Sequence, residues 1–93
     1  MMFTRIAPKQ VRHDSGFIVQ VASRETVEHV DGDRVAVFVI EIGSPGHALT
    51  LYTRRATWKD GGAPTDEERR VLAEQVRQGL TELIDRPVEI TDE

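Results

Sequence analysis

The sequence contains no cysteine among its 93 residues. This absence excludes a disulfide framework, a zinc site with thiolate ligands and a thiol nucleophile. The first residues also lack the apolar run, preceded by a basic start, that a secretory signal peptide needs. No stretch is apolar enough for long enough to span a membrane. We therefore expect a cytoplasmic protein without a membrane segment.

Aromatic residues are scarce and positive charge is in deficit. Aromatics make up 5% of the chain, and the formal net charge is −4, which opposes binding to nucleic acid by general electrostatics. The sole concentration of basic and aromatic residues consists of Arg54, Arg55 and Lys59 around Trp58. Because these are too few for a base-stacking platform, we expect nucleic acid not to be the partner.

The remaining composition is that of an ordinary globular protein, with 39% hydrophobic and 30% charged residues. At this length we expect a single α+β domain over residues 1–93. Residues 1–15 mix charges with isolated hydrophobic residues around Pro8 and show no clean period. They predict an irregular arm or a short edge strand.

Residues 34–42 form the most apolar and most β-branched run of the chain, and they predict a strand. Side chains alternate between the two faces of a strand. One face of this strand would carry Ala36, Phe38, Ile40 and Ile42, and the other Val35, Val37 and Val39. Neither face is suited to water, so each requires a cover.

Shorter runs predict further strands. Residues 17–22 suit one strand, and residues 24–30 either continue it or form a second. The turn Asp31-Gly32-Asp33 predicts a hairpin into the central strand, and residues 43–46 predict a second hairpin into a strand at 47–58. Residues 88–90 suit a short last strand at a sheet edge.

A single amphipathic helix is predicted between about Thr65 and Asp85. Thr65 and Glu68 have the spacing of a capping box, and Pro87 ends the helix. Gly79 borders the apolar stripe, where it either lets the helix approach the sheet closely or costs ~1 kcal/mol relative to Ala as a weak point. The stripe itself consists of Leu72, Ala73, Val76, Leu80, Leu83 and Ile84.

These elements predict an α+β fold with a three- to five-stranded, mainly antiparallel sheet (a β-meander) packed by one long C-terminal helix. The helix can meet the Phe38 and Ile40 face or the valine face, and the sequence does not choose between them. One helix covers one face of a small sheet. Something else must cover the second face, either the N-terminal arm or a second copy of the protein.

Few residues suggest catalysis or metal binding. His13, Asp14 and Ser15 are the residue types of a hydrolase triad, but chain neighbours cannot form the required series of hydrogen bonds. The three histidines, His13, His29 and His47, lack metal-ligand spacing, and 31–33 is too short for a calcium loop. We expect no catalytic residue, no metal and no cofactor.

The two-faced strand favours a binding protein, most simply a homodimer that engages a protein partner through its sheet. The alternative is a small enzyme or ligand-binding protein with a pocket between helix and sheet that uses His29, His47 or Arg54. The candidate interface consists of Val35, Val37, Val39, Tyr52, Arg54 and Trp58.

The C-terminal half of the chain runs from a strand ending near Trp58, through a Gly/Pro connector with Pro64, into a helix opened by Thr65, Glu67 and Glu68. This layout resembles the C-terminal half of some small bacterial immunity proteins that are paired with polymorphic toxins. The resemblance implies a cytosolic protein that binds a toxin and has no catalytic activity of its own.

Overall fold

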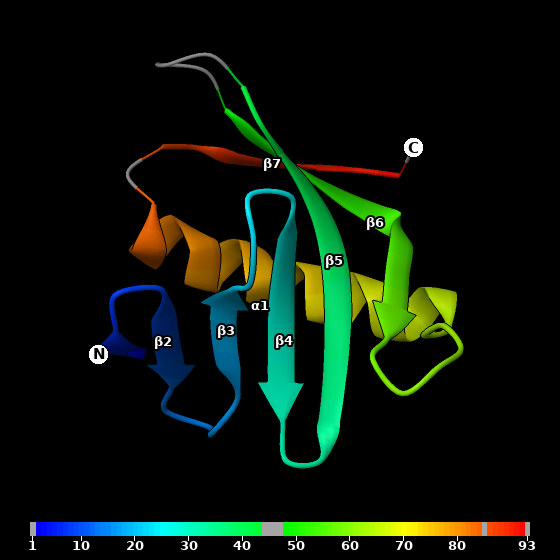
Figure 1. Cartoon of the computed structure of the whole chain (residues 1–93), viewed down its shortest axis with the longest axis horizontal. Coiled ribbons are helices and arrows are strands. Elements are labelled where there is room, and N and C mark those ends of the chain that lie inside the picture. The colour runs from blue at the N-terminus through cyan, green and yellow to red at the C-terminus, as the bar shows by residue number, and fades with distance from the viewer. Residues whose placement is uncertain (1, 44–47, 85, 93) are drawn as a thin grey trace.

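A computed structural model describes residues 2–43, 48–84 and 86–92, and over these residues the chain forms one helix and seven strands (Figure 1). The class is α+β, as predicted, and the helix α1 (Asp66–Leu83) follows six of the strands. It is not long and apolar enough to cross a membrane. The strands are β1 (Phe3–Ala7), β2 (Gln10–His13), β3 (Ile18–Val21), β4 (Thr26–Asp31), β5 (Arg34–Ile42), β6 (Leu49–Trp58) and β7 (Val88–Thr91).

All seven strands belong to one sheet, in which each strand pairs with the next along the chain. The pairs from β1 to β6 are antiparallel, so the sheet is mainly antiparallel, as predicted. The last pair, β6 and β7, is parallel. The helix α1 lies between these two strands in the chain and carries it back along the sheet, so that β7 runs in the same direction as β6.

The predicted number of strands, three to five, is wrong, and the additional strands lie in the N-terminal half. Residues 1–15, expected as an irregular arm or a short edge strand, form the β1–β2 hairpin at the edge of the sheet. Of the two alternatives for residues 24–30, the structure has the second, since β4 is a strand separate from β3. Strands of four or five residues with one buried side chain, such as Phe3 or Val11, show no periodicity in the sequence.

The predicted turn between β4 and β5 is confirmed. Asp31 pairs with Arg34 across a two-residue loop, and Gly32 has a φ of +59° at its first position, which suits glycine in a tight hairpin. Residues 44–46 of the predicted loop at 43–46 lie outside the described residues, and so does His47.

The helix begins as the sequence predicts. Thr65 accepts a hydrogen bond from the Glu68 backbone, and the Glu68 carboxylate accepts one from the Thr65 backbone at 2.9 Å, which completes a capping box. The helical segment ends at Leu83, with Ile84 as its cap. Asp85, where the prediction placed the end, lies outside the described residues.

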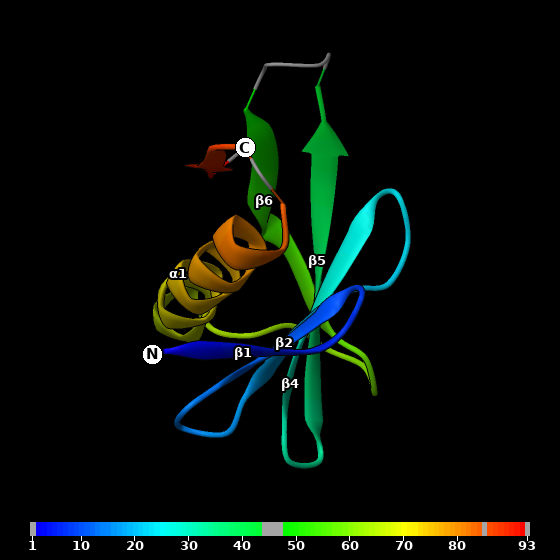
Figure 2. The ribbon, with the colours of Figure 1, turned by 90° about the vertical axis from the view of Figure 1, so that its left-hand side faces the viewer.

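The helix covers the face of the sheet that carries Phe38. Figures 1 and 2 show α1 on one side of the sheet, running across it behind β3, β4 and β5. The structure thereby decides between the two faces that the sequence left open. The buried core unites Ala36, Phe38 and Ile40 of β5 with Ala73, Val76 and Leu80 of the helix.

Gly79 packs closely against the sheet, which is the first of the two alternatives that the sequence left open. A Cβ atom added at Gly79 would lie 2.6 Å from the Cβ of Val19 in β3, closer than two carbon atoms can pack. Val19 is fully buried. A missing side chain is therefore required here for α1 to lie flat on the sheet.

The substitution Gly79→Ala should reduce the free energy of unfolding by about 1–3 kcal/mol, because the added methyl group overpacks the contact with Val19. Helix propensity alone predicts the opposite sign, a gain of about 1 kcal/mol. Urea denaturation of Gly79→Ala and of the exposed helix control Thr81→Ala measures the difference. A stabilised Gly79→Ala variant would contradict the close contact.

Candidate functional site

The valine side of β5 forms a sheet face that α1 does not cover, which we call the open face. Val35, Val37 and Val39 are half-buried on it, and Tyr52 joins them because it pairs with Val39 across β5 and β6. Four of the six predicted interface residues thus lie on one surface, which faces the viewer in Figure 1. Figure 2 shows it edge-on, opposite the helix.

The N-terminal segment does not cover the open face, although the sequence offered it as one of two possible covers. It forms the β1–β2 hairpin, which extends the sheet sideways. Phe3 and Val11 of this hairpin are buried in the core on the helix side. The segment is therefore part of the sheet through its backbone hydrogen bonds, and it leaves the open face uncovered.

Polar side chains cross the open face in a row, which we call the polar ladder. Gln10 donates to Gln20, Gln20 donates to Glu28 at 2.6 Å, and Glu28 pairs with the Lys59 ammonium at 3.3 Å. Lys59 follows β6, so its side chain crosses β5 to reach β4. The expectation that neither face of β5 suits water therefore needs correction, because this face combines valines with a hydrogen-bonded polar row.

A large bulge in β6 determines where Arg54 lies. Val37 pairs with Thr57 and Val39 pairs with Tyr52, so residues 53–56 stand opposite the single residue Phe38. Bulges bend a strand and redirect its side chains. Arg54 is thereby separated from Tyr52 and the valines, and it lines a different pocket.

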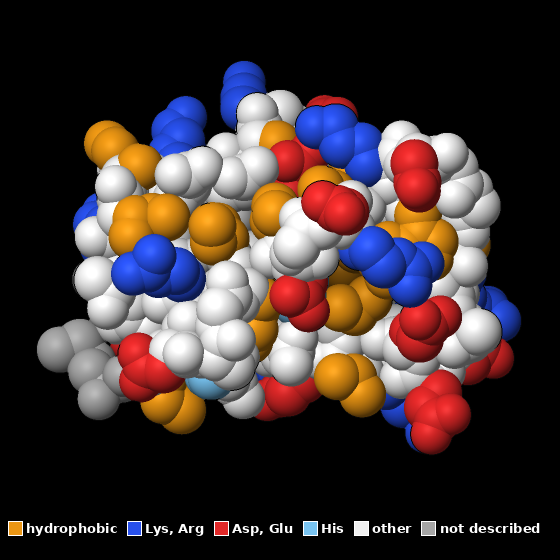
Figure 3. Space-filling model, turned by 90° about the horizontal axis from the view of Figure 1, so that it is seen from below, with side chains coloured by type: hydrophobic (Ala, Val, Ile, Leu, Met, Phe, Trp, Pro, Cys, Tyr) orange, Lys and Arg blue, Asp and Glu red, His pale blue; other side chains and the backbone are white. Residues whose placement is uncertain are grey.

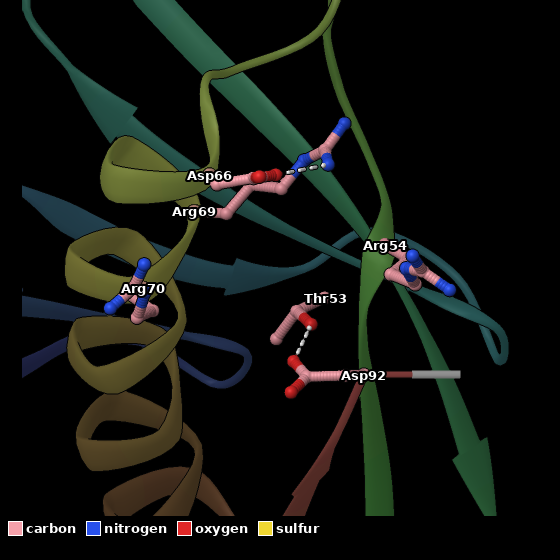
Figure 4. Close-up of a pocket in the computed structure, with 6 residues that line it drawn as sticks. All are labelled: Thr53, Arg54, Asp66, Arg69, Arg70 and Asp92. Atoms are coloured by element: carbon pink, nitrogen blue, oxygen red, sulfur yellow. Dashed lines mark hydrogen bonds and ion pairs between the residues drawn. The ribbon is translucent and has the colours of Figure 1, made fainter.

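This bulge pocket has a volume of about 610 Å³ and lies between β6, the first turn of α1 and the segment after β7 (Figure 4). Asp66 pairs with Arg69 at 3.2 Å, and the Thr53 hydroxyl bonds to Asp92 at 2.9 Å, so both carboxylates are engaged. In Figure 4, Arg54 extends from β6 away from the helix that carries Arg70. The two guanidinium groups do not converge on a common point.

Trp58 lies on the helix side of the sheet, opposite the valines with which the sequence grouped it. It pairs with Ala36, and the Arg34 guanidinium lies over its ring, 3.7 Å from the centroid. A cavity of about 470 Å³, which we call the Trp58 pocket, is lined by Trp58 and Arg34 together with His29 and Leu72. Sequence reasoning missed Arg34 and Leu72 as site residues, since nothing local links them to Trp58.

His29 forms the inner wall of the Trp58 pocket and is 2% exposed. Its Nε2 donates to the Gln75 side-chain oxygen at 2.7 Å, and its ring stacks on Phe17 with 4.8 Å between centroids. Burial lowers the pKa of His29 below its ordinary value of 6.5, because desolvation disfavours the imidazolium, while Gln75 and Asp31 partly oppose this effect. The neutral form of the imidazole is therefore favoured, and its Nε2 is bonded to Gln75.

The other residues considered for chemistry are not assembled into one site. Ser15 contacts His13 Nδ1 twice, with its hydroxyl at 2.8 Å and its backbone N–H at 3.0 Å, which is a local turn contact. His47 lies outside the described residues. Within residues 2–43, 48–84 and 86–92, no three His, Asp or Glu side chains are grouped so that they could hold a metal ion.

The three residues of the nucleic-acid hypothesis have different surroundings. Arg54 lines the bulge pocket, Arg55 lies over the Tyr52 ring at 4.6 Å, and Lys59 pairs with Glu28. Arg54 and Arg55 line separate pockets, the second of which also includes Val39 and Tyr52. The ion pair with Glu28 engages the third cation. They do not form one continuous basic stripe.

Acidification should destabilise the fold through His29. Below about pH 6.5 the unfolded chain takes up a proton that the buried imidazole resists, so the free energy of unfolding falls as the pH decreases from there toward the lowered pKa. Above that value His29 adds no pH dependence. Urea denaturation between about pH 7.5 and 5.5 measures the effect. His29→Gln should flatten the dependence, whereas equal slopes in His29→Gln and the unmodified protein would contradict the assignment.

Comparison with known proteins gave no match: no protein-family model matches the chain, and neither a curated protein nor a solved structure matches it significantly. The resemblance to immunity proteins therefore stays a prediction. Function has to be argued from the surfaces of the molecule itself.

Proposed function

We propose that this protein is a non-catalytic binding domain that associates with a second copy of itself through the open face. The observation that supports this most is that Val35, Val37 and Val39 lie on a sheet face over which none of the described elements packs. A sheet face is stably covered by another layer of structure. With the N-terminal hairpin built into the sheet, a second copy is the remaining cover of the two that the sequence offered.

The apolar side chains of the open face are contiguous. Ile18 pairs with Val30, and Val30 pairs with Val35, so an apolar row crosses β3, β4 and β5. Val39 and Tyr52 form a second apolar pair on the other side of the polar ladder. Two such rows give a partner sheet apolar contacts on both sides of a polar centre, the mixed composition of ordinary protein interfaces.

The outline of the molecule leaves room on the open face for an interface of ordinary size. The molecule measures 34 by 30 Å along its two longer axes, and Figure 1 views the sheet down the third, 21 Å axis. A face of this outline offers up to about 1,000 Å², compared with about 800 Å² per partner in a standard interface. Face-to-face packing of two such sheets would place both helices on the outside.

The polar ladder does not prevent such an interface. Glu28 is already 8% exposed in the single chain, and it is bonded to both Gln20 and Lys59. A polar group that already has its partners costs little to bury further, whereas an unpaired one costs about 1–3 kcal/mol. The ladder also makes the dimer specific, because arrangements that place its polar groups against apolar side chains of the second copy are disfavoured.

Several features support binding rather than catalysis. His29, whose pKa is lowered by burial, has its Nε2 bonded to Gln75 and its ring stacked on Phe17. The bulge pocket has guanidinium groups that do not converge. The resemblance to immunity proteins favours the same class, since it implies a protein that binds a partner and catalyses nothing.

The substitution Val37→Lys should convert the dimer into a monomer. Val37 is half-buried on the open face, so a lysine there can extend into solvent and keep the fold, but it places charge in the centre of the interface. Light scattering coupled to size exclusion, at micromolar to high micromolar concentration, measures the mass. The unmodified chain should have twice the monomer mass, and Val37→Lys the monomer mass.

The control is Thr81→Lys, which adds the same charge on an exposed position of the helix, away from the open face. It should remain dimeric, and circular dichroism should show that both variants fold. An unmodified protein that is monomeric at high micromolar concentration would disprove self-association through this face.

A further inference from the structure

The Trp58 pocket lies on the helix side of the sheet, so its role is separate from that of the open face. It opens where the β4–β5 turn, Trp58 at the end of β6 and the first turns of α1 meet. Figure 3 views this end of the molecule and shows hydrophobic side chains exposed between acidic and basic ones. At about 470 Å³ the cavity has room for one or two large side chains.

The apolar part of the pocket includes a side chain that the protein's own core does not use. Val71 is 57% exposed, although it stands next to Leu72, which packs against the core. Trp58 is half-buried beside them, and Arg34 lies over its ring. Valine, leucine and tryptophan on one rim form an apolar contact surface, and tryptophan and arginine are the residue types that most often dominate binding energy.

The polar rim of the pocket is acidic. Asp31 and Glu67 make no side-chain hydrogen bond or ion pair with any described residue, and Glu68 lies 3.8 Å from Arg34 across the opening. Arg34 thus neutralises one of three carboxylates, and two remain available. The chain as a whole carries a net charge of −4, which adds long-range attraction for a cationic partner.

We infer that the Trp58 pocket docks a segment of another protein in which a large apolar side chain is flanked by lysine or arginine. The apolar side chain would pack against Val71, Leu72 and Trp58, and the flanking cations would reach Asp31 and Glu67. The charge of the rim selects this segment over an acidic one, since carboxylates placed against Asp31 and Glu67 would repel.

The single tryptophan of the chain provides a direct measurement, because Trp58 is itself part of the pocket. The probe is a synthetic 12-residue peptide in which pairs of leucines alternate with pairs of lysines. It is titrated into the full chain while the fluorescence of Trp58 is followed. The matched peptide with glutamate in place of lysine is the second probe. The lysine peptide should give a saturable change in emission that weakens with salt, and the glutamate peptide should give none.

Two substitutions test the two halves of the pocket, with binding measured by calorimetry as well as fluorescence. Val71→Asp should weaken binding of the lysine peptide at least about tenfold, because it removes the apolar contact, and Glu67→Lys should do the same by reversing the rim charge. The control is Glu82→Lys, which makes the same charge change at an exposed position near the other end of α1. It should bind as the unmodified chain does.

Three outcomes would overturn the assignment. These are no saturable binding of the lysine peptide, equal binding of the glutamate peptide, and equal weakening by Glu82→Lys and Glu67→Lys, which would indicate general charge attraction. The assignment is independent of self-association, because Val37→Lys acts on the opposite face of the sheet. That variant should still bind the lysine peptide, so failure of the dimer and failure of the docking site are distinguishable.

Discussion

The contact between Gly79 and Val19 is the constraint on which the rest of the structure depends. With no side chain at Gly79, the helix backbone approaches β3 so closely that an added Cβ would overlap Val19. This approach lets Val76 and Leu80 reach the core below Phe38. A helix held farther away would leave a gap at the centre of this core, and small domains have little apolar area to spare.

In the described part of the chain, one helix packs against a seven-stranded sheet, which leaves one sheet face without a helix. The helix covers the Phe38 side, and the valine side is left with a polar ladder and two apolar rows. Where α1 begins, it also forms a seam with the end of β6, and the Trp58 pocket lies in this seam. The two proposed binding surfaces are therefore consequences of the same packing, on opposite sides of one sheet.

Sequence reasoning succeeded for long or strongly marked elements and failed for short ones. The β5 strand, the turn at Gly32 and the capping box at Thr65 all follow from local signals, and the structure contains each of them. The β1–β2 hairpin was missed because its strands have four or five residues and few buried side chains. The bulge of β6 was also missed, since it depends on which residues of β5 lie opposite, and that information is not local.

The sequence by itself determined that this is an α+β protein with an amphipathic C-terminal helix and an apolar central strand, because each rests on periodicity or on the chemistry of a few neighbouring residues. Tertiary structure alone decided which face of the strand the helix covers. It also placed Trp58 on the other side of the sheet from Val37 and moved Arg54 into a separate pocket. These outcomes depend on strand register and on contacts between residues far apart in the chain, which no local pattern encodes.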